Sequence, residues 1–173
     1  MTRLENKVAV ITGAANGQGA AEALAFAAEG ASVVLSDVDG RGAGLAEEIT
    51  SRGGQAKFVK HDVRDEDGWV DLAAKVKSWF GNLHILVNNA GTISRQGVLN
   101  STLSEWHRTI DVNLTGPMLG MKHCAPLIRD AGGGSIVNVS STAGLLAHYD
   151  AAYGASKWAL RGLTKTAAME LVC

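Results

Sequence analysis

Hydrophobic runs alternate along the chain with polar, helix-forming stretches. Short apolar runs rich in β-branched residues predict five buried strands, at Lys7–Thr12, Ser32–Asp37, Ala56–His61, Ile85–Asn88 and Ser135–Ser140. Alanine-rich or amphipathic stretches predict helices at Gly19–Glu29, Gly42–Arg52, Glu66–Phe80, Leu103–Asp130 and Ala151–Val172. Within the long region Leu103–Asp130, we expect Thr115-Gly116-Pro117 and Pro126 to kink or divide the helix.

This alternation predicts the fold class. Apolar strands that alternate with helices are typical of a parallel sheet covered on both faces. We therefore predict a doubly wound α/β fold with a Rossmann-type strand order. The 173 residues fit one domain over 1–173. We see no linker, low-complexity tract or internal repeat.

Composition excludes several function classes. The net charge of -1 leaves no basic surplus for nucleic acid. The two cysteines cannot form a disulfide framework, and the five histidines lack metal-ligand spacing, so we expect no metal. No stretch is long and apolar enough to span a membrane, and the first residues lack a secretory leader, so we expect a cytoplasmic protein without membrane partners.

A glycine-rich turn follows the first predicted strand. It runs from Thr12 to Gly19 with the spacing G-x3-G-x-G and leads into a helix. Glycines there permit a tight turn and close approach of the backbone to a pyrophosphate, which the helix N-terminus attracts. A plain turn is the alternative, because short motifs also occur by chance. The candidate cofactor-binding residues of this turn are Gly13, Asn16, Gly17, Gln18 and Gly19.

Asp37 ends the second predicted strand. A carboxylate at this place can accept hydrogen bonds from the adenine ribose hydroxyls and would repel a 2′-phosphate. We therefore predict NAD as the cofactor in preference to NADP. Arg41 is the one nearby cation that could reach such a phosphate, and a solvated strand-end carboxylate is the alternative role for Asp37.

Tyr153 and Lys157 are four residues apart at the start of the last predicted helix, so they share one face. A lysine ammonium one turn away favours a phenolate over a phenol, which suits tyrosine for proton exchange with an alcohol or a carbonyl. Such pairs also arise by chance on helix surfaces. Here the pair follows a strand end that carries Ser140 and Ser141, and ligands bind at strand carboxyl ends in this architecture.

Taken together, these residues resemble the short-chain dehydrogenase/reductase family. The resemblance rests on Thr12-Gly13-x3-Gly17-x-Gly19, on Asn88-Asn89-Ala90-Gly91, on Asn113 in DVNLTG, on Ser141 and on Tyr153-x3-Lys157, all in the family's order. Segments around DVNLTGPMLGMK and YGASKWALRGLTK look similar to the hydroxysteroid dehydrogenase branch.

The resemblance implies a role for each matching residue. Tyr153 is implied as the general acid/base, Lys157 as its electrostatic partner and a ligand of the nicotinamide ribose, and Ser141 as the residue that holds the substrate oxygen. Asn113 is implied to position a water. Further residues implied to border the cofactor are Asp62, Val63, Asn89, Ala90 and Gly91.

The chain departs from the family pattern in two ways. The spacing from Ser141 to Tyr153 is one residue shorter than expected, which keeps Ser140 as an alternative for Ser141. Family members also continue past the tyrosine helix with another strand and a substrate-covering segment, so we expect the region up to Cys173 to lack both.

We therefore expect an NAD-dependent oxidoreductase that interconverts a secondary alcohol, including a hydroxysteroid, and a ketone. The resemblance also implies a homodimer or homotetramer paired through the helices at Leu103–Asp130 and Ala151–Val172. The alternative is a nucleotide-binding module without catalysis, or an incomplete fragment of such an enzyme.

Overall fold

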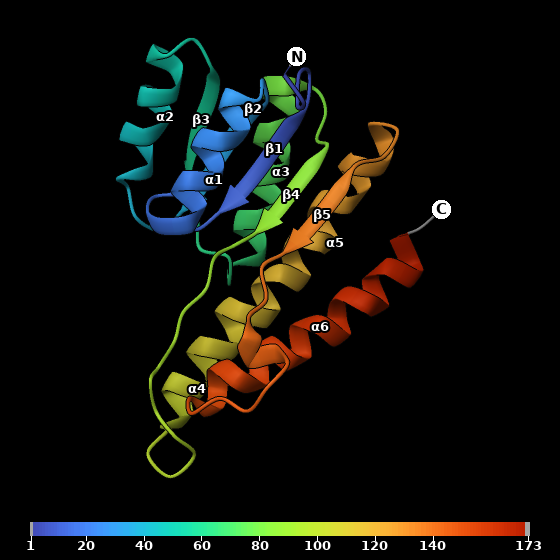
Figure 1. The fold of residues 1–173 in the computed structure, drawn as a ribbon. Helices are drawn as coiled ribbons and strands as arrows, with labels where there is room; N and C mark the ends of the chain where they lie inside the picture. Colours follow the sequence, from blue (N-terminus) through green and yellow to red (C-terminus); the bar gives the residue numbers. More distant parts are fainter. Residues whose placement is uncertain (1, 172–173) are drawn as a thin grey trace.

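A computed structural model describes residues 2–171 and shows a five-stranded sheet with helices on both faces (Figure 1). In chain order the strands are β1 (Val8–Thr12), β2 (Ser32–Asp37), β3 (Gln55–Lys60), β4 (Ile85–Asn88) and β5 (Ser135–Asn138). The helices are α1 (Gly17–Ala28), α2 (Gly42–Ser51), α3 (Glu66–Phe80), α4 (Leu103–Ile110), α5 (Gly116–Asp130) and α6 (Ala151–Leu171). A π-helical turn, η1 (Asp111–Thr115), joins α4 to α5, and a 3-10 turn, η2 (Thr142–Gly144), follows β5.

The strand order is β3-β2-β1-β4-β5, and every neighbouring pair is parallel. The chain builds outward from β1 to β3, returns to the other side of β1 at β4, and then continues to β5. This reversal beside β1 is the topological switch point at which doubly wound proteins bind ligands. The predicted fold class is therefore confirmed.

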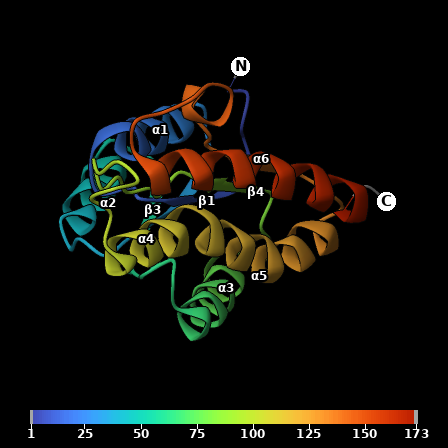
Figure 2. The ribbon, with the colours of Figure 1, turned by 90° about the horizontal axis from the view of Figure 1, so that it is seen from below.

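The alternation of side chains along each strand divides the core into two clusters. In β1, Val8 and Val10 pack on the face that α3 and α5 cover, together with Trp69 and Leu119. Ile11 points to the other face, where the buried residues of α1 and α2 lie. Figure 2 shows α1 on one side of the sheet and α3 and α5 on the other. Burial on both faces explains why the strands are apolar throughout.

Strand β5 lies at an edge of the sheet in the described part of the chain. Ile136 packs against the core cluster on the α5 side. Val137 points to the opposite face and is 44% exposed. One face of β5 is therefore covered less completely than the corresponding faces of β1 and β2.

The long helical region divides where the sequence predicts a division at Gly116, but Pro126 does not interrupt it. Between α4 and α5 the chain forms the π-helical turn that contains Asn113, a local geometry often found at functional sites. Pro126 lies inside α5, which continues to Asp130. The buried residues Leu119, Cys124 and Ile128 on this helix offset the hydrogen bond that proline removes.

The other boundaries agree with the prediction or differ from it by one or two residues. Strand β5 ends at Asn138, two residues before its predicted end, so Ser140 lies beyond the strand, as Ser141 does. Val172 and Cys173 lie outside the described residues. Cys124 is buried, and burial raises the pKa of its thiol to about 12. No helix among residues 2–171 has the length and apolar character needed to cross a membrane.

Candidate active site

A cavity of about 830 Å³ runs along the carboxyl ends of the strands and gathers almost all of the predicted site residues. From the glycine-rich turn it includes Gly13, Asn16, Gly17, Gln18 and Gly19. From the loops after β2, β3, β4 and β5 and from α6 it includes Asp37, Asp62, Val63, Asn89, Ala90, Gly91, Ser141, Tyr153 and Lys157. Asn113 is fully buried and is not part of the lining. Segments far apart in the sequence therefore meet in one site.

The glycine-rich turn has the backbone geometry that its spacing suggests. Gly13 and Gly17 have φ values of 65° and 57°, in the left-handed region that favours glycine. A Cβ on Gly19 would lie 2.3 Å from the main-chain oxygen of Gly13, so α1 packs against the turn more closely than any side chain would permit. Asn16 is the N-cap residue, and its side chain makes no capping hydrogen bond. The first N–H groups of α1 thus remain able to bind an anion.

Thr12 and Asn89 fasten the segment after β4 to this turn. The Thr12 hydroxyl oxygen accepts hydrogen bonds from the N–H groups of Asn89 and Ala90, at 3.1 and 3.0 Å. In return, the side-chain amide of Asn89 donates to the main-chain oxygens of Thr12 and Gly13, at 2.8 and 3.2 Å. Asn89 therefore fixes the shape of the cavity through its side chain, beyond merely bordering it.

The carboxylate of Asp37 is held in place beside the glycine-rich turn. Its Oδ2 accepts a hydrogen bond from the Ala15 N–H at 2.9 Å, and its Oδ1 accepts one from the Asp39 N–H at 2.9 Å. Arg41 pairs with Asp39, with 2.6 Å between its Nη2 and the carboxylate. The Arg41 guanidinium, which the sequence suggested as a possible ligand of a 2′-phosphate, is therefore already paired with the Asp39 carboxylate.

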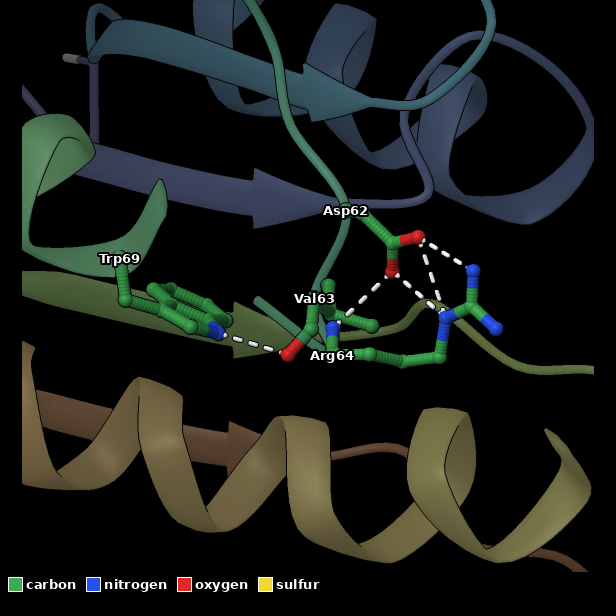
Figure 3. A network of polar contacts seen from close by, with 4 residues as sticks. All are labelled: Asp62, Val63, Arg64 and Trp69. Carbon is green, nitrogen blue, oxygen red and sulfur yellow. Dashed lines mark hydrogen bonds and ion pairs between the residues drawn. The ribbon is translucent and has the colours of Figure 1, made fainter. Parts of the chain in front are cut away.

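Asp62 and Val63 lie where the loop after β3 reaches the cavity, and each is held by a neighbour (Figure 3). The guanidinium of Arg64 binds both carboxylate oxygens of Asp62, and these bonds lower the pKa of Asp62. The indole N–H of Trp69 donates to the main-chain oxygen of Val63 at 2.9 Å. Trp69 is fully buried, so this bond anchors the loop to the core.

Asn113 is bound from three sides inside the π-helical turn. Its Oδ1 accepts from the Thr92 N–H at 2.8 Å, and its Nδ2 donates to the Thr92 main-chain oxygen at 2.9 Å. The same Nδ2 lies 3.0 Å from the Ser156 hydroxyl on α6. The side chain of Asn113 therefore joins the loop after β4 to the tyrosine helix.

Tyr153 and Lys157 lie together on the cavity side of α6. The Lys157 Nζ lies 5.6 Å from the centre of the Tyr153 ring and donates a hydrogen bond to the Val139 main-chain oxygen at 2.8 Å. Lys157 is only 4% exposed, and burial lowers its pKa. This places a desolvated ammonium group next to the phenol, as the i, i+4 spacing predicts.

The two serines after β5 have different partners. The Ser140 hydroxyl donates to the main-chain oxygen of Lys157 at 3.4 Å. The Ser141 Oγ accepts from the Ala143 N–H at 3.1 Å, as the cap of η2, which leaves its own proton available to a ligand. Both line the cavity, but this difference favours Ser141 as the group that donates to a substrate oxygen.

Sequence reasoning missed several residues that shape the site. Arg64, Thr92 and Val139 act through the contacts given above. His148 also lines the cavity, with its ring centre 5.2 Å from that of Tyr153. The i, i+2 spacing of Asp62 and Arg64 was a signal that could have been used. The partner of Lys157 and two of the three partners of Asn113 are main-chain groups, which leave no trace in residue type.

Comparison with known proteins places the chain in context. The sequence model of the family described as "short chain dehydrogenase" matches residues 7–172. The chain is 45% identical over 177 residues to the trans-4-hydroxycyclohexanecarboxylate dehydrogenase of Sinomonas cyclohexanicum, covering 98% of this chain and 68% of that protein. It is 42% identical over 171 residues to the 3-alpha-(or 20-beta)-hydroxysteroid dehydrogenase of Mycobacterium tuberculosis, covering 98% of this chain and 65% of that protein. The chain thus spans about two thirds of the length of these curated relatives.

Solved structures agree with this similarity. A metagenomic short-chain oxidoreductase in complex with NADP superposes with a TM-score of 0.91 and 38% identity, over 97% of this chain and 77% of that one. A short-chain type dehydrogenase/reductase from Mycobacterium marinum gives a TM-score of 0.93 and 35% identity, over 97% of this chain and 70% of that one.

Proposed function

Because the chain belongs to the short-chain dehydrogenase family, we propose that it is an oxidoreductase that interconverts a secondary alcohol and a ketone with NAD(H). The observation that carries this proposal is the cavity itself. It holds a glycine-rich anion-binding turn at one place and Tyr153, Lys157 and Ser141 at another. A nucleotide and a small alcohol can therefore occupy the same site.

The residues present fit a nicotinamide dinucleotide. Because Gly19 has no Cβ, α1 packs closely on the turn, and the first N–H groups of the helix can bind a pyrophosphate there. The carboxylate of Asp37 can accept from the adenine ribose, and Asp62 and Val63 border the place for the adenine. Lys157 can donate to the nicotinamide ribose. When bound, the cofactor supplies the acceptor or donor of the hydride.

The chain's own residues handle the proton and the substrate oxygen. Tyr153 takes the proton of the alcohol in oxidation and returns it to the ketone oxygen in reduction. The ammonium group of Lys157 stabilises the phenolate form by its charge, in an environment where burial strengthens the interaction. The hydroxyl of Ser141 donates a hydrogen bond to the same oxygen. Asn113 holds the loop after β4 against α6 and so fixes the distance between these two segments, which both line the cavity.

We propose NAD as the preferred cofactor because of the contacts of Asp37. Two N–H groups fix its carboxylate, so the negative charge cannot easily move away from a 2′-phosphate. Arg41 is paired with Asp39, so its guanidinium is already engaged by another carboxylate. One structural neighbour was solved with NADP, so the cofactor must be compared directly.

For the substrate, we propose a ring-bound secondary alcohol, with hydroxysteroids among the candidates. The names of the relatives support this class, since they act on hydroxycyclohexanecarboxylate, hydroxysteroids and cyclohexanol. Ile93 and His148 line the cavity and offer an apolar and an aromatic contact to such a ring, and the His148 ring lies next to that of Tyr153.

We also propose self-association through the long helices, as the family resemblance implies. Support comes from large apolar side chains that are exposed on α4 and α6. Leu103 is 76% exposed, Trp158 is 51% exposed and Met169 is 86% exposed. Light scattering at micromolar concentration tests this, and a monomer would contradict it.

The test of function combines cofactor titration with turnover on a panel of cyclic secondary alcohols that includes steroids. We expect NADH to bind more tightly than NADPH, and Asp37→Ala to narrow that difference because the repelling charge is removed. Tyr153→Phe should leave NADH binding within about twofold and reduce turnover by 100-fold or more, since proton transfer contributes about 10²–10⁴-fold.

Three results would contradict parts of this proposal. Tighter binding of NADPH would overturn the cofactor preference. Near-normal turnover by Tyr153→Phe would overturn the acid/base role. Cofactor binding without turnover on any alcohol would favour the alternative of a nucleotide-binding module.

A further inference from the structure

Asp150 is a buried carboxylate next to the tyrosine helix that neither the cavity lining nor the proposed chemistry includes. It is 1% exposed and directly precedes α6. Its Oδ1 accepts a hydrogen bond from the Tyr153 N–H at 2.7 Å, and its main-chain oxygen accepts one from the Gly154 N–H at 3.0 Å. With this first oxygen, Asp150 caps the N-terminus of α6.

The second carboxylate oxygen binds a different segment. Its partners are the Ser94 hydroxyl, at 2.8 Å, and the main-chain N–H of Arg95. A main-chain bond from the Ala151 N–H to the Gln96 oxygen, at 3.1 Å, lies beside them. Ser94, Arg95 and Gln96 belong to the loop between β4 and α4, which passes the first turn of α6 in both ribbon views (Figures 1 and 2). One carboxylate therefore joins a loop and a helix that are about 55 residues apart in sequence.

The loop has an unusual backbone at this point. Arg95 has a φ of 61°, in the left-handed region that residues with a side chain rarely adopt. Such a conformation persists where surrounding contacts hold it. The Arg95 N–H points at the Asp150 carboxylate, so the two features support each other.

The charge of Asp150 suits this role. Burial opposes ionisation of the carboxyl group, but hydrogen bonds from Tyr153, Ser94 and Arg95 outweigh it and lower the pKa of Asp150. The carboxylate form has acceptor sites on both oxygens. An asparagine amide at this place would instead turn its NH₂ group toward the N–H or O–H donors of one of the two segments. A neutral amide could accept from the helix or from the loop, but not from both at once.

Both joined segments line the cavity. The loop contributes Thr92 and Ile93, and the helix contributes Tyr153. Asn113 ties Thr92 to α6 further inside, at Ser156. Asp150 makes a second connection between the same loop and α6, at the start of the helix.

We infer that Asp150 is a positioning residue: its carboxylate fixes the start of the tyrosine helix against the Ser94–Gln96 loop and so sets where Tyr153 stands relative to the substrate. This inference rests on the proposed function, because Tyr153 matters only if it exchanges a proton. A residue that acted only as a helix cap would not need the second oxygen.

Asp150→Ser separates the two roles. Serine is about as good an N-cap as aspartate, so the helix start is kept, but its single hydroxyl does not reach both the helix and the loop. We expect kcat to fall about tenfold or more, while the Kd for NADH stays within about twofold and the melting temperature changes little. Asp150→Asn should also lower kcat, because its amide has one acceptor oxygen and turns its NH₂ group toward the donors of either the helix or the loop.

A matched control removes a cap elsewhere. Thr102 caps α4 through its side chain and the Glu105 N–H, and it is not among the hydrogen-bond partners of the Asp150 carboxylate. Thr102→Ala should lower the melting temperature with little change in kcat. Ser94→Ala, which removes only one of the two loop bonds, should lower kcat by a smaller factor than Asp150→Ser.

Failure of the inference differs from failure of the proposed function. Wild-type kcat and KM in both Asp150→Ser and Asp150→Asn would overturn the positioning role. A wild-type chain that turns over no alcohol would instead overturn the proposed function. In that case amide hydrogen exchange tests whether the Asp150 carboxylate holds the loop. We expect the Arg95 N–H to exchange faster in Asp150→Ser, and unchanged exchange there would overturn the inference.

Discussion

Replacing Gly19 by alanine tests how closely α1 must approach the glycine-rich turn. A Cβ at this position would lie 2.3 Å from the Gly13 main-chain oxygen, 2.9 Å from its carbonyl carbon and 2.5 Å from the Asn89 side-chain amide. Two of these atoms are backbone, and the third is fixed by bonds to Thr12 and Gly13. No flexible side chain is available to move aside.

The geometry sets the size of the effect. Contacts below 3.0 Å essentially do not occur for real Cβ atoms, so the start of α1 must move away from the turn. Over-packing of this kind costs about 1–3 kcal/mol, and we expect the upper half of that range because backbone must shift. The first N–H groups of α1 move with the helix. Loss of one hydrogen bond to a charged group, about 1.5–3 kcal/mol, corresponds to a roughly 10- to 100-fold weaker cofactor affinity.

The assay pairs urea unfolding with NADH titration, and Gly44→Ala is the control. Gly44 is an exposed residue of α2, and a Cβ there would meet nothing within 4 Å. Its replacement should leave NADH binding unchanged and stabilise the chain by up to about 1 kcal/mol through helix propensity. A folded Gly19→Ala protein with wild-type stability and wild-type NADH affinity would refute the argument, since the close approach would then have no consequence.

Two further predictions concern the loop after β3. Trp69→Phe removes the indole N–H that donates to the main-chain oxygen of Val63. We expect the free energy of unfolding in urea to fall by about 1–3 kcal/mol and NADH to bind more weakly. Unchanged values in both measurements would contradict the anchoring role. His61 has a pKa lowered by burial, so its neutral form stabilises the fold fully above the unfolded-state pKa of about 6.5, and that contribution is lost as pH falls from there through the folded-state pKa. The free energy of unfolding should therefore decrease by up to about 1.4 kcal/mol per pH unit for this group, and His61→Gln should flatten the decrease between about pH 6.5 and 5; an identical slope in both proteins would show that His61 is not the cause.

The sequence by itself was sufficient for the elements and for most of the cavity lining. Val8–Thr12 and Ser32–Asp37 are apolar because helices cover both faces of the sheet, so the burial of these strands can be inferred from their residue types. Strand carboxyl ends in such a sheet meet along one edge, so residues that follow strands had to come together. This is why the glycine-rich turn and Asp37 could be placed from their positions, whereas Asp62 was placed by the family resemblance.

Boundaries and helix irregularities could be predicted less well. The sequence predicted that Pro126 would kink or divide the helix, and α5 is not divided there. The local sequence contains no signal for the π-helical turn around Asn113 beyond Gly116 and Pro117.

The tertiary structure alone decided which groups hold the site residues in place. Lys157 donates to the main chain at Val139, and Asp150 binds main-chain and side-chain groups of a loop about 55 residues away. Hydrophobic periodicity reports whether a position is buried, because burial depends on the local face of a helix or strand. The partner of a buried polar group depends instead on how two distant segments are packed against each other, and that arrangement exists only once the chain has folded.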